Sequence, residues 1–236
     1  MSQQITTFTF FRFTGFRNKL WAFKMMQFAH SDLGKVEGLK FYKLLGSGKG
    51  LGFNPLPDWS VYTLLQVWDN QAQADLFFKN NDLFHSYQKS ATDIWTLYTR
   101  NIIAKGSWTG ANPFEKSDAL NKSNSFIVVI TRATIKTNKL IAFWRSVPAS
   151  HAQLHANKGL IYTKGIGEVP LVQMATFSLW KDAESLKQFA YKSAEHKEAI
   201  AKTRALNWFK EDLFSRFQPY LSKGTWSGIN PLPDLE

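Results

Sequence analysis

One unusual phrase occurs twice in this chain of 236 residues. Residues 106–114 read GSWTGANPF and residues 224–232 read GTWSGINPL, and a lysine precedes each copy. Matched positions are 118 residues apart, which is half of the chain length. This period is far longer than that of a solenoid repeat, so each copy belongs to a domain-sized unit. The sequence therefore predicts a tandem duplication, with an N-terminal half at residues 1–118 and a C-terminal half at residues 119–236.

A second match links the beginnings of the two halves. Residues 12–23 read RFTGFRNKLWAF and residues 132–143 read RATIKTNKLIAF, which share Arg, Thr, Asn-Lys-Leu and Ala-Phe at an offset of 120. Between the two matches, GLKFYK at residues 38–43 recurs as GLIYTK at residues 159–164. Because several segments match at nearly one offset, the similarity extends over whole units and is not a local coincidence.

The same order of elements is predicted in both halves from hydrophobic periodicity and turn residues. Strands are expected at residues 5–13, 39–45, 61–68, 102–108, 126–133, 159–165, 171–180 and 221–226. Helices are expected at residues 18–30, 70–80, 82 to about 100, 138–147 and 182 to about 217. The order strand, helix, strand, strand, helix, strand is the ferredoxin-like arrangement. We thus expect an α+β fold, with two ferredoxin-like halves packed as an intramolecular dimeric α/β barrel and the twin phrases ending the last strand of each half.

Composition narrows the class of protein further. Hydrophobic residues make up 44% of the chain, enough to bury a sizeable core. No apolar run reaches the length of about 20 residues that spans a membrane. The absence of cysteine excludes disulfides, thiolate catalysis and cysteine-bound metal centres. The N-terminus lacks the pattern of a signal peptide, so we expect a cytoplasmic protein.

The formal net charge of +11 is spread over both halves. Such a charge favours nucleic acid, an anionic membrane surface, or solubility alone. RNA-binding ferredoxin-like domains carry the pattern Lys/Arg-Gly-Phe/Tyr, which is missing here, and the aromatic residues of this chain fall in predicted helices as well. A basic RNA-binding module is therefore only an alternative, and no nucleic-acid partner is expected.

Five histidines are the main candidate metal ligands. His151 and His155 have the four-residue spacing of a helical zinc site, but no glutamate lies between them. His30 is expected at the end of a helix, where a cation suits the helix dipole without any further function. His85 falls near the position in the first half that His196 takes in the second half.

His196 lies in SAEHKEAIAKTRALNWF, which predicts a helix with two different faces. One side gathers Glu195, Glu198 and Lys202. The other side gathers His196, Ile200, Thr203, Arg204 and Asn207. Inner helix faces are usually aliphatic, so this polar composition favours a pocket for a polar cofactor. A structural histidine with a satisfied hydrogen bond stays open as the alternative.

Long segments of the chain resemble one known family. They are FFRFTGFRNKLWAF, YKLLGSGKGLGFNPLP, TRATIKTNKLIAFW, KGIGEVP and EHKEAIAKTRALNWFKEDLFSRF. These segments are similar to those of the spheroidene monooxygenase family of carotenoid oxygenases, and the similarity runs nearly end to end. The resemblance implies a haem b protein that uses O₂ and electrons from an external donor. It further implies oxidation at C-2 of the end group of an acyclic or monocyclic carotenoid, giving hydroxy and then keto products.

The resemblance also assigns roles to residues of the predicted helix. The family's motif, Pro/Glu-His-x-x-Ala-Ile-x-x-x-Arg, places His196 as the axial ligand of the haem iron. The preceding residue is Glu195 where proline is common in the family. Ile200 and Thr203 would then line the cofactor, and Arg204 would either pair with a haem propionate or lie at the protein surface.

One further arginine is a candidate catalytic residue. The sequence match pairs Arg132 with Arg12 at predicted strand ends, and Arg132 is proposed as a polar group beside the O₂ site, with Arg12 as a weaker candidate. The implied partners are an apolar carotenoid, an electron-transfer protein such as a ferredoxin, and the anionic inner face of a membrane, which the protein would touch peripherally. A non-catalytic haem-binding or haem-degrading barrel is the alternative within the same fold.

Overall fold

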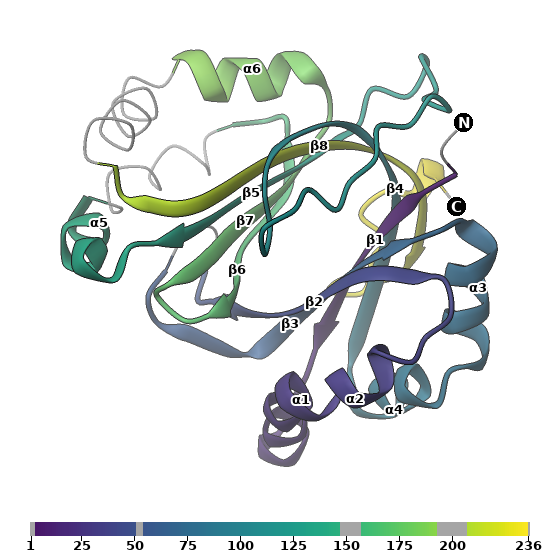
Figure 1. Ribbon diagram of the computed structural model, residues 1–236. Coiled ribbons are helices and arrows are strands. Elements are labelled where there is room, and N and C mark those ends of the chain that lie inside the picture. The colour runs from purple at the N-terminus through teal and green to yellow at the C-terminus, as the bar shows by residue number, and fades with distance from the viewer. Residues whose placement is uncertain (1–2, 51–53, 147–156, 193–206, 236) are drawn as a thin grey trace.

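Eight antiparallel strands form one closed barrel (Figure 1). The computed structural model describes residues 3–50, 54–146, 157–192 and 207–235, and the strands follow the order β1-β3-β2-β6-β7-β5-β8-β4 around the barrel. The first half supplies β1 (Ile5–Arg12), β2 (Leu39–Gly48), β3 (Pro57–Trp68) and β4 (Asp93–Gly106). The second half supplies β5 (Ile127–Ile135), β6 (Leu160–Val169), β7 (Gln173–Trp180) and β8 (Phe209–Gly224). Each half is a four-stranded ferredoxin-like sheet, so the predicted duplicated barrel is confirmed.

The interior of the barrel is filled by one hydrophobic core to which both halves contribute. Along β1, Phe8 and Phe10 point into this core and Phe11 points outward, as the two-residue period of a strand requires. The ring of Phe8 lies 5.1 Å from that of Phe177 and 5.3 Å from that of Phe217, between centroids. Rings from the two halves therefore interlock at the centre, and the interior is a packed core.

Helices lie on the outer sides of the two sheets (Figure 1). The first half has α1 (Phe16–Phe28), α2 (His30–Leu33), α3 (Gln71–Asn80) and α4 (Asp82–Ser90), and the second half has α5 (Leu140–Ser146) and α6 (Ala183–Lys192). Short 3₁₀ turns occur at Thr137–Lys139 and Pro233–Leu235. The side chain of Asn70 accepts a hydrogen bond from the Gln73 N–H at the start of α3, which is the N-cap contact that asparagine favours.

Two of the predicted helices extend too far and are corrected by the structure. The helix predicted from residue 82 to about residue 100 ends at Ser90, and β4 begins at Asp93. The helix predicted to continue to about residue 217 is also wrong there, because β8 begins at Phe209. Both segments form strands because they pair with strands that are distant in the sequence. β4 lies between β1 and β8, and β8 lies between β4 and β5, so the backbone groups of these residues are bonded across the sheet.

The twin phrases end β4 and β8 with the same backbone path. Gly106 has φ +95° and Gly224 has φ +84°, and a Cβ atom at either would collide with a backbone oxygen of the neighbouring strand. Glycine is therefore required at both positions. Beyond each glycine the chain turns inward, and Trp108 and Trp226 enter the core near opposite ends of β4. The strand-ending role predicted for the phrases is confirmed.

The two halves meet along two unequal seams. The seam between β4 and β8 is long and runs from the pair Trp95–Gly224 to the pair Gly106–Leu213. The seam between β2 and β6 is short, with Gly46 opposite Gly167 and the neighbouring residues paired beside them. The short seam leaves the edges of β2 and β6 free to diverge, and a groove lies over it.

Candidate active site

The residues predicted to hold haem lie outside the described part of the chain. They fall within residues 193–206 and are His196, Ile200, Thr203 and Arg204. The alternative zinc pair, His151 and His155, lies outside the described residues as well. Arg132 and Arg12 are described, and so are the surfaces of both sheets.

The two described histidines with predicted positions have ordinary hydrogen bonds. His30 Nδ1 lies 3.1 Å from the Tyr42 hydroxyl, and His85 Nε2 lies 3.0 Å from the Lys79 carbonyl oxygen. Within the described ranges, no three His, Cys, Asp or Glu side chains are grouped as a metal site. In the same ranges, no helix has both the length and the apolar character needed to cross a bilayer.

Arg132 lies inside the barrel, where β5 places it in line with the inward residues Val128 and Ile130. Its side chain is only 2% exposed and forms ion pairs with Glu211 and Glu168, the latter at 3.5 Å from Nη2. The Trp108 ring centroid lies 5.6 Å from the guanidinium carbon. The charge of Arg132 is therefore neutralised within a buried cluster at one end of the barrel.

The first twin phrase completes this cluster. Trp108 Nε1–H donates to Glu168 at 2.6 Å, and the Ser107 hydroxyl and the Gly110 N–H donate to Glu211 at 3.0 and 2.7 Å. Burial alone would raise the pKa of Glu211, but the hydrogen bonds from Gly110, Arg132 and Ser107 outweigh it and lower the pKa to about 2. Glu211 is thus held as a carboxylate by groups from both halves.

A matching cluster lies at the other end of the barrel. The guanidinium of Arg12 lies 4.4 Å from the ring centroid of Trp226, which belongs to the second twin phrase, and 3.6 Å from the carboxylate of Asp93. Lys164 of β6 pairs with Asp58 of β3 at 2.9 Å. Each end of the barrel therefore combines an arginine of one half with a tryptophan of the other half.

Strand register gives the equivalence between the halves. Thr6 lies opposite Thr99, and Val128 lies opposite Phe217, while Thr99 and Phe217 are separated by the same 118 residues as the twin phrases. Thr6 therefore corresponds to Val128, at an offset of 122. By the same argument the offset is 121 from β2 to β6 and 112 from β3 to β7.

This register corrects the pairing of the two arginines. Arg132 corresponds to Phe10, and Arg12 corresponds to Thr134, so the sequence match of Arg12 with Arg132 is wrong by two residues. The helical Asn-Lys-Leu triplets do match at an offset of 120. The connection from β5 to the following helix is therefore two residues shorter than the connection from β1 to α1, and this difference shifts the strands against the helices.

The outer faces of the two sheets differ sharply at equivalent positions. Thr9 and Thr131 are the same residue type at the same register position, at the centre of β1 and of β5. Thr9 is 0% exposed and hydrogen-bonds Thr96 at 3.1 Å. Thr131 is exposed. The first half thus buries the threonine at the centre of its sheet, whereas the second half leaves the equivalent threonine exposed.

Small residues replace large ones over this second face. In the first half the outward residues include Phe11, Tyr42, Leu44, Leu64 and Gln66. Their equivalents in the second half are Ala133, Thr163, Gly165, Thr176 and Ser178. Two apolar clusters flank the depleted centre, one around Phe143 and Trp208 and the other around Val129 and Trp180. We call this surface the depleted face.

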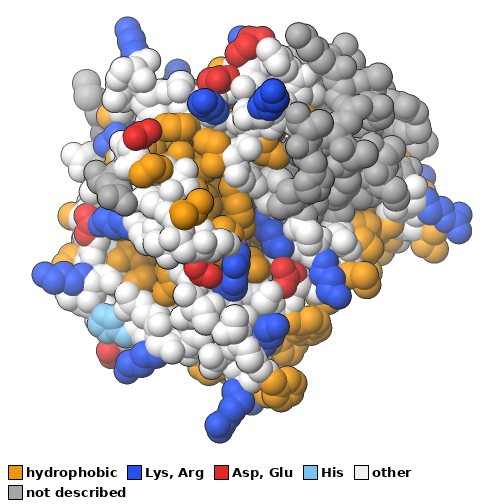
Figure 2. All heavy atoms as spheres, turned by 180° about the vertical axis from the view of Figure 1, so that it is seen from behind, with side chains coloured by type: hydrophobic (Ala, Val, Ile, Leu, Met, Phe, Trp, Pro, Cys, Tyr) orange, Lys and Arg blue, Asp and Glu red, His pale blue; other side chains and the backbone are white. Residues whose placement is uncertain are grey.

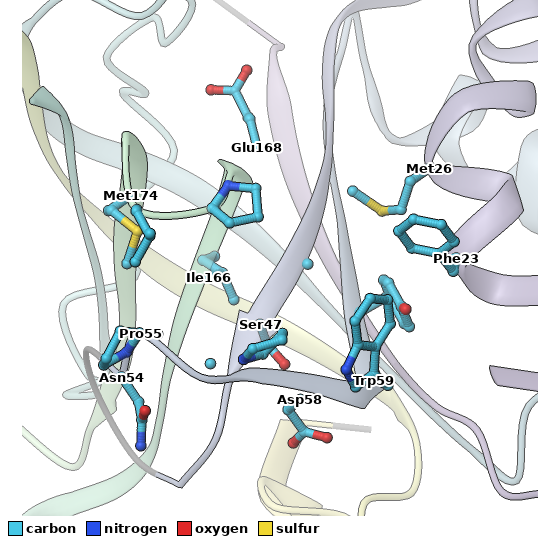
Figure 3. A pocket seen from close by; sticks show the side chains of 18 residues that line it. Phe23, Met26, Ser47, Asn54, Pro55, Asp58, Trp59, Ile166, Glu168 and Met174 are labelled. Carbon is cyan, nitrogen blue, oxygen red and sulfur yellow. The ribbon is translucent and has the colours of Figure 1, made fainter. Parts of the chain in front are cut away.

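A groove of about 190 Å³ opens beside the depleted face, over the short seam (Figure 3). On one side it is lined by Phe23 and Met26 of α1 together with Trp59 of β3. On the other side it is lined by Ile166 and Met174 of the second half. Sequence reasoning missed both the groove and the depleted face. The signal for the depleted face was present in the halves, but it appears only when the strands are aligned at their own offsets of 122, 121 and 112 residues.

Known proteins similar to this chain support one family. The chain matches no protein-family model. It is 36% identical over 230 residues to the spheroidene monooxygenase of Cereibacter sphaeroides, covering 97% of this chain and 71% of that protein. It is 34% identical over 229 residues to the spheroidene monooxygenase of Rhodobacter capsulatus, covering 97% and 95%.

Among solved structures, an aldoxime dehydratase shares the fold, with a TM-score of 0.62, 11% identity and coverage of 92% of this chain and 82% of that one. The low identity limits this likeness to the fold. The identity to the two monooxygenases extends over nearly the whole chain and includes both halves of the duplication. On this ground the resemblance noted in the sequence is confirmed, and the chain belongs to the spheroidene monooxygenase family.

Proposed function

We propose that this protein is a haem-dependent monooxygenase that uses O₂ to oxidise a C-2-type position in the end group of an acyclic or monocyclic carotenoid. The observation that carries the proposal is the depleted face, where Ala133 stands in place of Phe11 and Thr131 is exposed. The substrate class follows from the name of the related monooxygenases.

The residue types on the depleted face support the proposal that haem binds there. Its centre carries small side chains and a glycine, so a flat ring can approach the sheet closely. Its margins are apolar and aromatic, with Phe143 and Trp208 on one side and Trp180 on the other. A large planar cofactor would bury apolar surface here that the corresponding helices bury in the first half.

The proposed iron ligand follows from the duplication. Helices α3 and α6 have equal length and begin 112 residues apart, which is also the offset between β3 and β7. If this offset continues through the next turn, Phe84 corresponds to His196. Phe84 packs on Phe11 with ring centroids 6.4 Å apart. We therefore propose that His196 stands over the space that Ala133 leaves, with a neutral imidazole toward the iron.

The remaining residues of that segment have supporting roles in the proposal. Arg204 would pair with a haem propionate, and Ile200 and Thr203 would line the cofactor. Haem bound there would supply the activation of O₂ and the oxidation of a C–H bond, with electrons from a ferredoxin or similar donor. Arg132 points into the barrel, on the opposite side of the sheet from the depleted face, so its catalytic role stays a prediction to be tested separately.

Contact with the membrane is the second part of the proposal. A carotenoid is dissolved in the bilayer, so a cytoplasmic enzyme must meet its substrate at the membrane surface. Figure 2 shows Lys and Arg side chains scattered over the visible face, in keeping with the net charge of +11. Such a distribution favours weak, salt-sensitive attraction to anionic lipid, which we expect to be released as ionic strength rises past about 0.15 M.

The test compares two histidine variants in protein produced with sufficient haem. Wild-type protein is expected to show a Soret band, His196→Ala to lose it, and His85→Ala to keep it, because only His196 is proposed to bind iron. Wild-type protein that stays colourless and takes up no haemin would contradict haem dependence. If His85→Ala lost the Soret band and His196→Ala kept it, the haem site would lie in the first half instead.

Product analysis separates the alternatives. An enzyme with the proposed function converts a carotenoid to hydroxy or keto products when O₂ and an electron donor are supplied. A haem carrier would show the Soret band without conversion. A haem-degrading barrel would instead lose the Soret band when O₂ and the donor are added.

A further inference from the structure

We infer that the groove over the β2–β6 seam binds one end of an extended polyene hydrocarbon and directs it to the depleted face. The identity of the ligand rests on the proposed function, whereas the location of the site rests on the described residues alone. The groove lies outside the barrel, between α1 and the turn that connects β6 to β7 (Figure 3).

The walls of the groove suit an unsaturated hydrocarbon. Phe23, Trp59 and Tyr62 present aromatic rings, and Met26 and Met174 present flexible, polarisable side chains. Such surfaces hold a conjugated chain by dispersion, and they adapt to its shape. No donor or acceptor on the ligand is needed for this kind of contact.

The two acidic residues of the lining are paired elsewhere. Asp58 accepts hydrogen bonds from Ser60 and Lys164, the latter at 2.9 Å, and Glu168 accepts from Lys43 at 2.7 Å and from Trp108. Their charges are thereby compensated by partners from the barrel ends, so they do not make the groove a cation site.

The mouth of the groove is apolar and open to solvent. Phe23 and Trp59 are each 50% exposed, and their rings stack edge to face with centroids 5.1 Å apart. Leu171 on the opposite rim is 41% exposed. A groove of about 190 Å³ is smaller than the roughly 300–1,000 Å³ typical of sites that enclose a whole drug-sized ligand. It therefore takes an end segment, and the rest of a long polyene extends past these exposed rings.

The inner end of the groove reaches the proposed cofactor site. Gly165 and Met174 line the groove and also belong to the outer face of the second-half sheet, where Met174 packs with Ile135 and Phe143. A chain that enters between Phe23 and Leu171 therefore meets the depleted face at its terminus. This order matches oxidation at the end of the molecule and not along its middle.

Glycine forms the floor of the groove, and one glycine offers a clean test. Gly46 lines the groove, and a Cβ atom there would have no neighbour closer than the Gly167 oxygen at 3.9 Å, so a side chain can begin at this position without displacing backbone. Gly46→Leu is expected to fill the floor. Gln88→Leu, at an exposed position of α4, adds the same side chain far from the groove.

The measurement is retention of spheroidene, added in detergent micelles, on protein purified by gel filtration, read as carotenoid absorbance per protein. Gly46→Leu is expected to lower retention at least tenfold and Gln88→Leu to leave it unchanged. Equal retention by Gly46→Leu and wild type would overturn the inference. Soret absorbance measured on the same samples reports haem binding separately. The groove inference can therefore be judged even if the haem proposal fails.

A second pair of variants covers the case in which Gly46→Leu fails to fold. Phe23→Asp places a charge at the groove mouth, while Phe16→Asp places the same charge on α1 at a residue that is 80% exposed and does not line the groove. Retention is expected to fall severalfold in Phe23→Asp and to persist in Phe16→Asp. Equal retention by the two variants would place the carotenoid elsewhere.

Discussion

Trp108 and Trp226 close opposite ends of one barrel, each over an arginine that belongs to the other half. Trp108 lies over Arg132 at 5.6 Å and Trp226 lies over Arg12 at 4.4 Å. The twin phrases that reveal the duplication in the sequence are thus the segments that bind the two halves to each other. Neither half completes its own end of the core.

The first prediction follows for a half expressed alone. Residues 1–118 lack β8, the partner of β4 along the long seam, and they lack Trp226. The exposed strand edge and open core are expected to make this fragment insoluble or self-associating. Size-exclusion chromatography checks the result, and co-expression of residues 119–236 is expected to restore a soluble complex. A monomeric, cooperatively folded fragment would contradict the interdependence of the halves.

The second prediction concerns Arg132. Arg132→Met leaves Glu168 and Glu211 without their shared buried cation, so the free energy of unfolding is expected to fall by about 3–5 kcal/mol. The matched variant Arg12→Met removes an arginine whose side chain is 31% exposed. For this variant the free energy of unfolding is expected to fall by about 1 kcal/mol. Urea denaturation measures both.

The same pair of variants tests the catalytic role of Arg132. If Arg132→Met keeps its stability and its Soret band but no longer oxidises carotenoid, Arg132 acts in the reaction. If loss of activity follows loss of folded protein, its role is structural.

The third prediction concerns pH. The pKa of Glu211 is lowered from 4.5 to about 2, so the folded state binds this proton less readily than the unfolded state does. The resulting stabilisation is complete above about pH 4.5 and is lost as the pH falls toward about 2, by on the order of 1–3 kcal/mol. Glu211→Gln is expected to flatten this part of the profile of melting temperature against pH. Glu184→Gln, at an exposed carboxylate of α6, is the control and should keep the wild-type slope.

The fourth prediction refills the depleted face. Ala133→Phe restores the side chain that the first half carries at the equivalent Phe11, and it is expected to lower Soret absorbance per protein severalfold while the protein still folds. The reverse change in the first half, Phe11→Ala, opens a cavity under α4 and is expected to cost about 3–5 kcal/mol without direct loss of haem sites. If Ala133→Phe bound haem as fully as wild type, the depleted face would be excluded as the cofactor site.

The sequence predicts the duplication and most strands because local signals mark them. Gly106 and Gly224 each end a strand for a steric reason that acts within their own turn, and β1 alternates Thr with Phe. The start of β4 at Asp93 was not predictable in the same way. Residues after Ser90 carry spacing compatible with a helix, and the competing strand gains its hydrogen bonds from β1 and β8, which are distant in the sequence.

The candidate site depends even more on distant residues. The groove exists because Gly46 meets Gly167 across the short seam, and no pattern within either segment reports that meeting. The depleted face was not visible in the sequence because the helices match at an offset two residues smaller than that of β1 and β5. The helix offset aligns Arg132 with Arg12, so the correspondence of Ala133 with Phe11 was missed. His196 was assigned from a helix pattern and a family motif, and it lies outside the described residues.

The contrast between Thr9 and Thr131 has a consequence for how such a chain can change. The first half buries Thr9 at the centre of its sheet, and the long seam joins that sheet to its copy, in which Thr131 is exposed. Side chains around the open sheet are then free to vary with the shape of a substrate. Laboratory evolution toward new polyenes should therefore find productive substitutions around the second sheet and along the groove, to which the first half contributes Phe23, Met26 and Trp59.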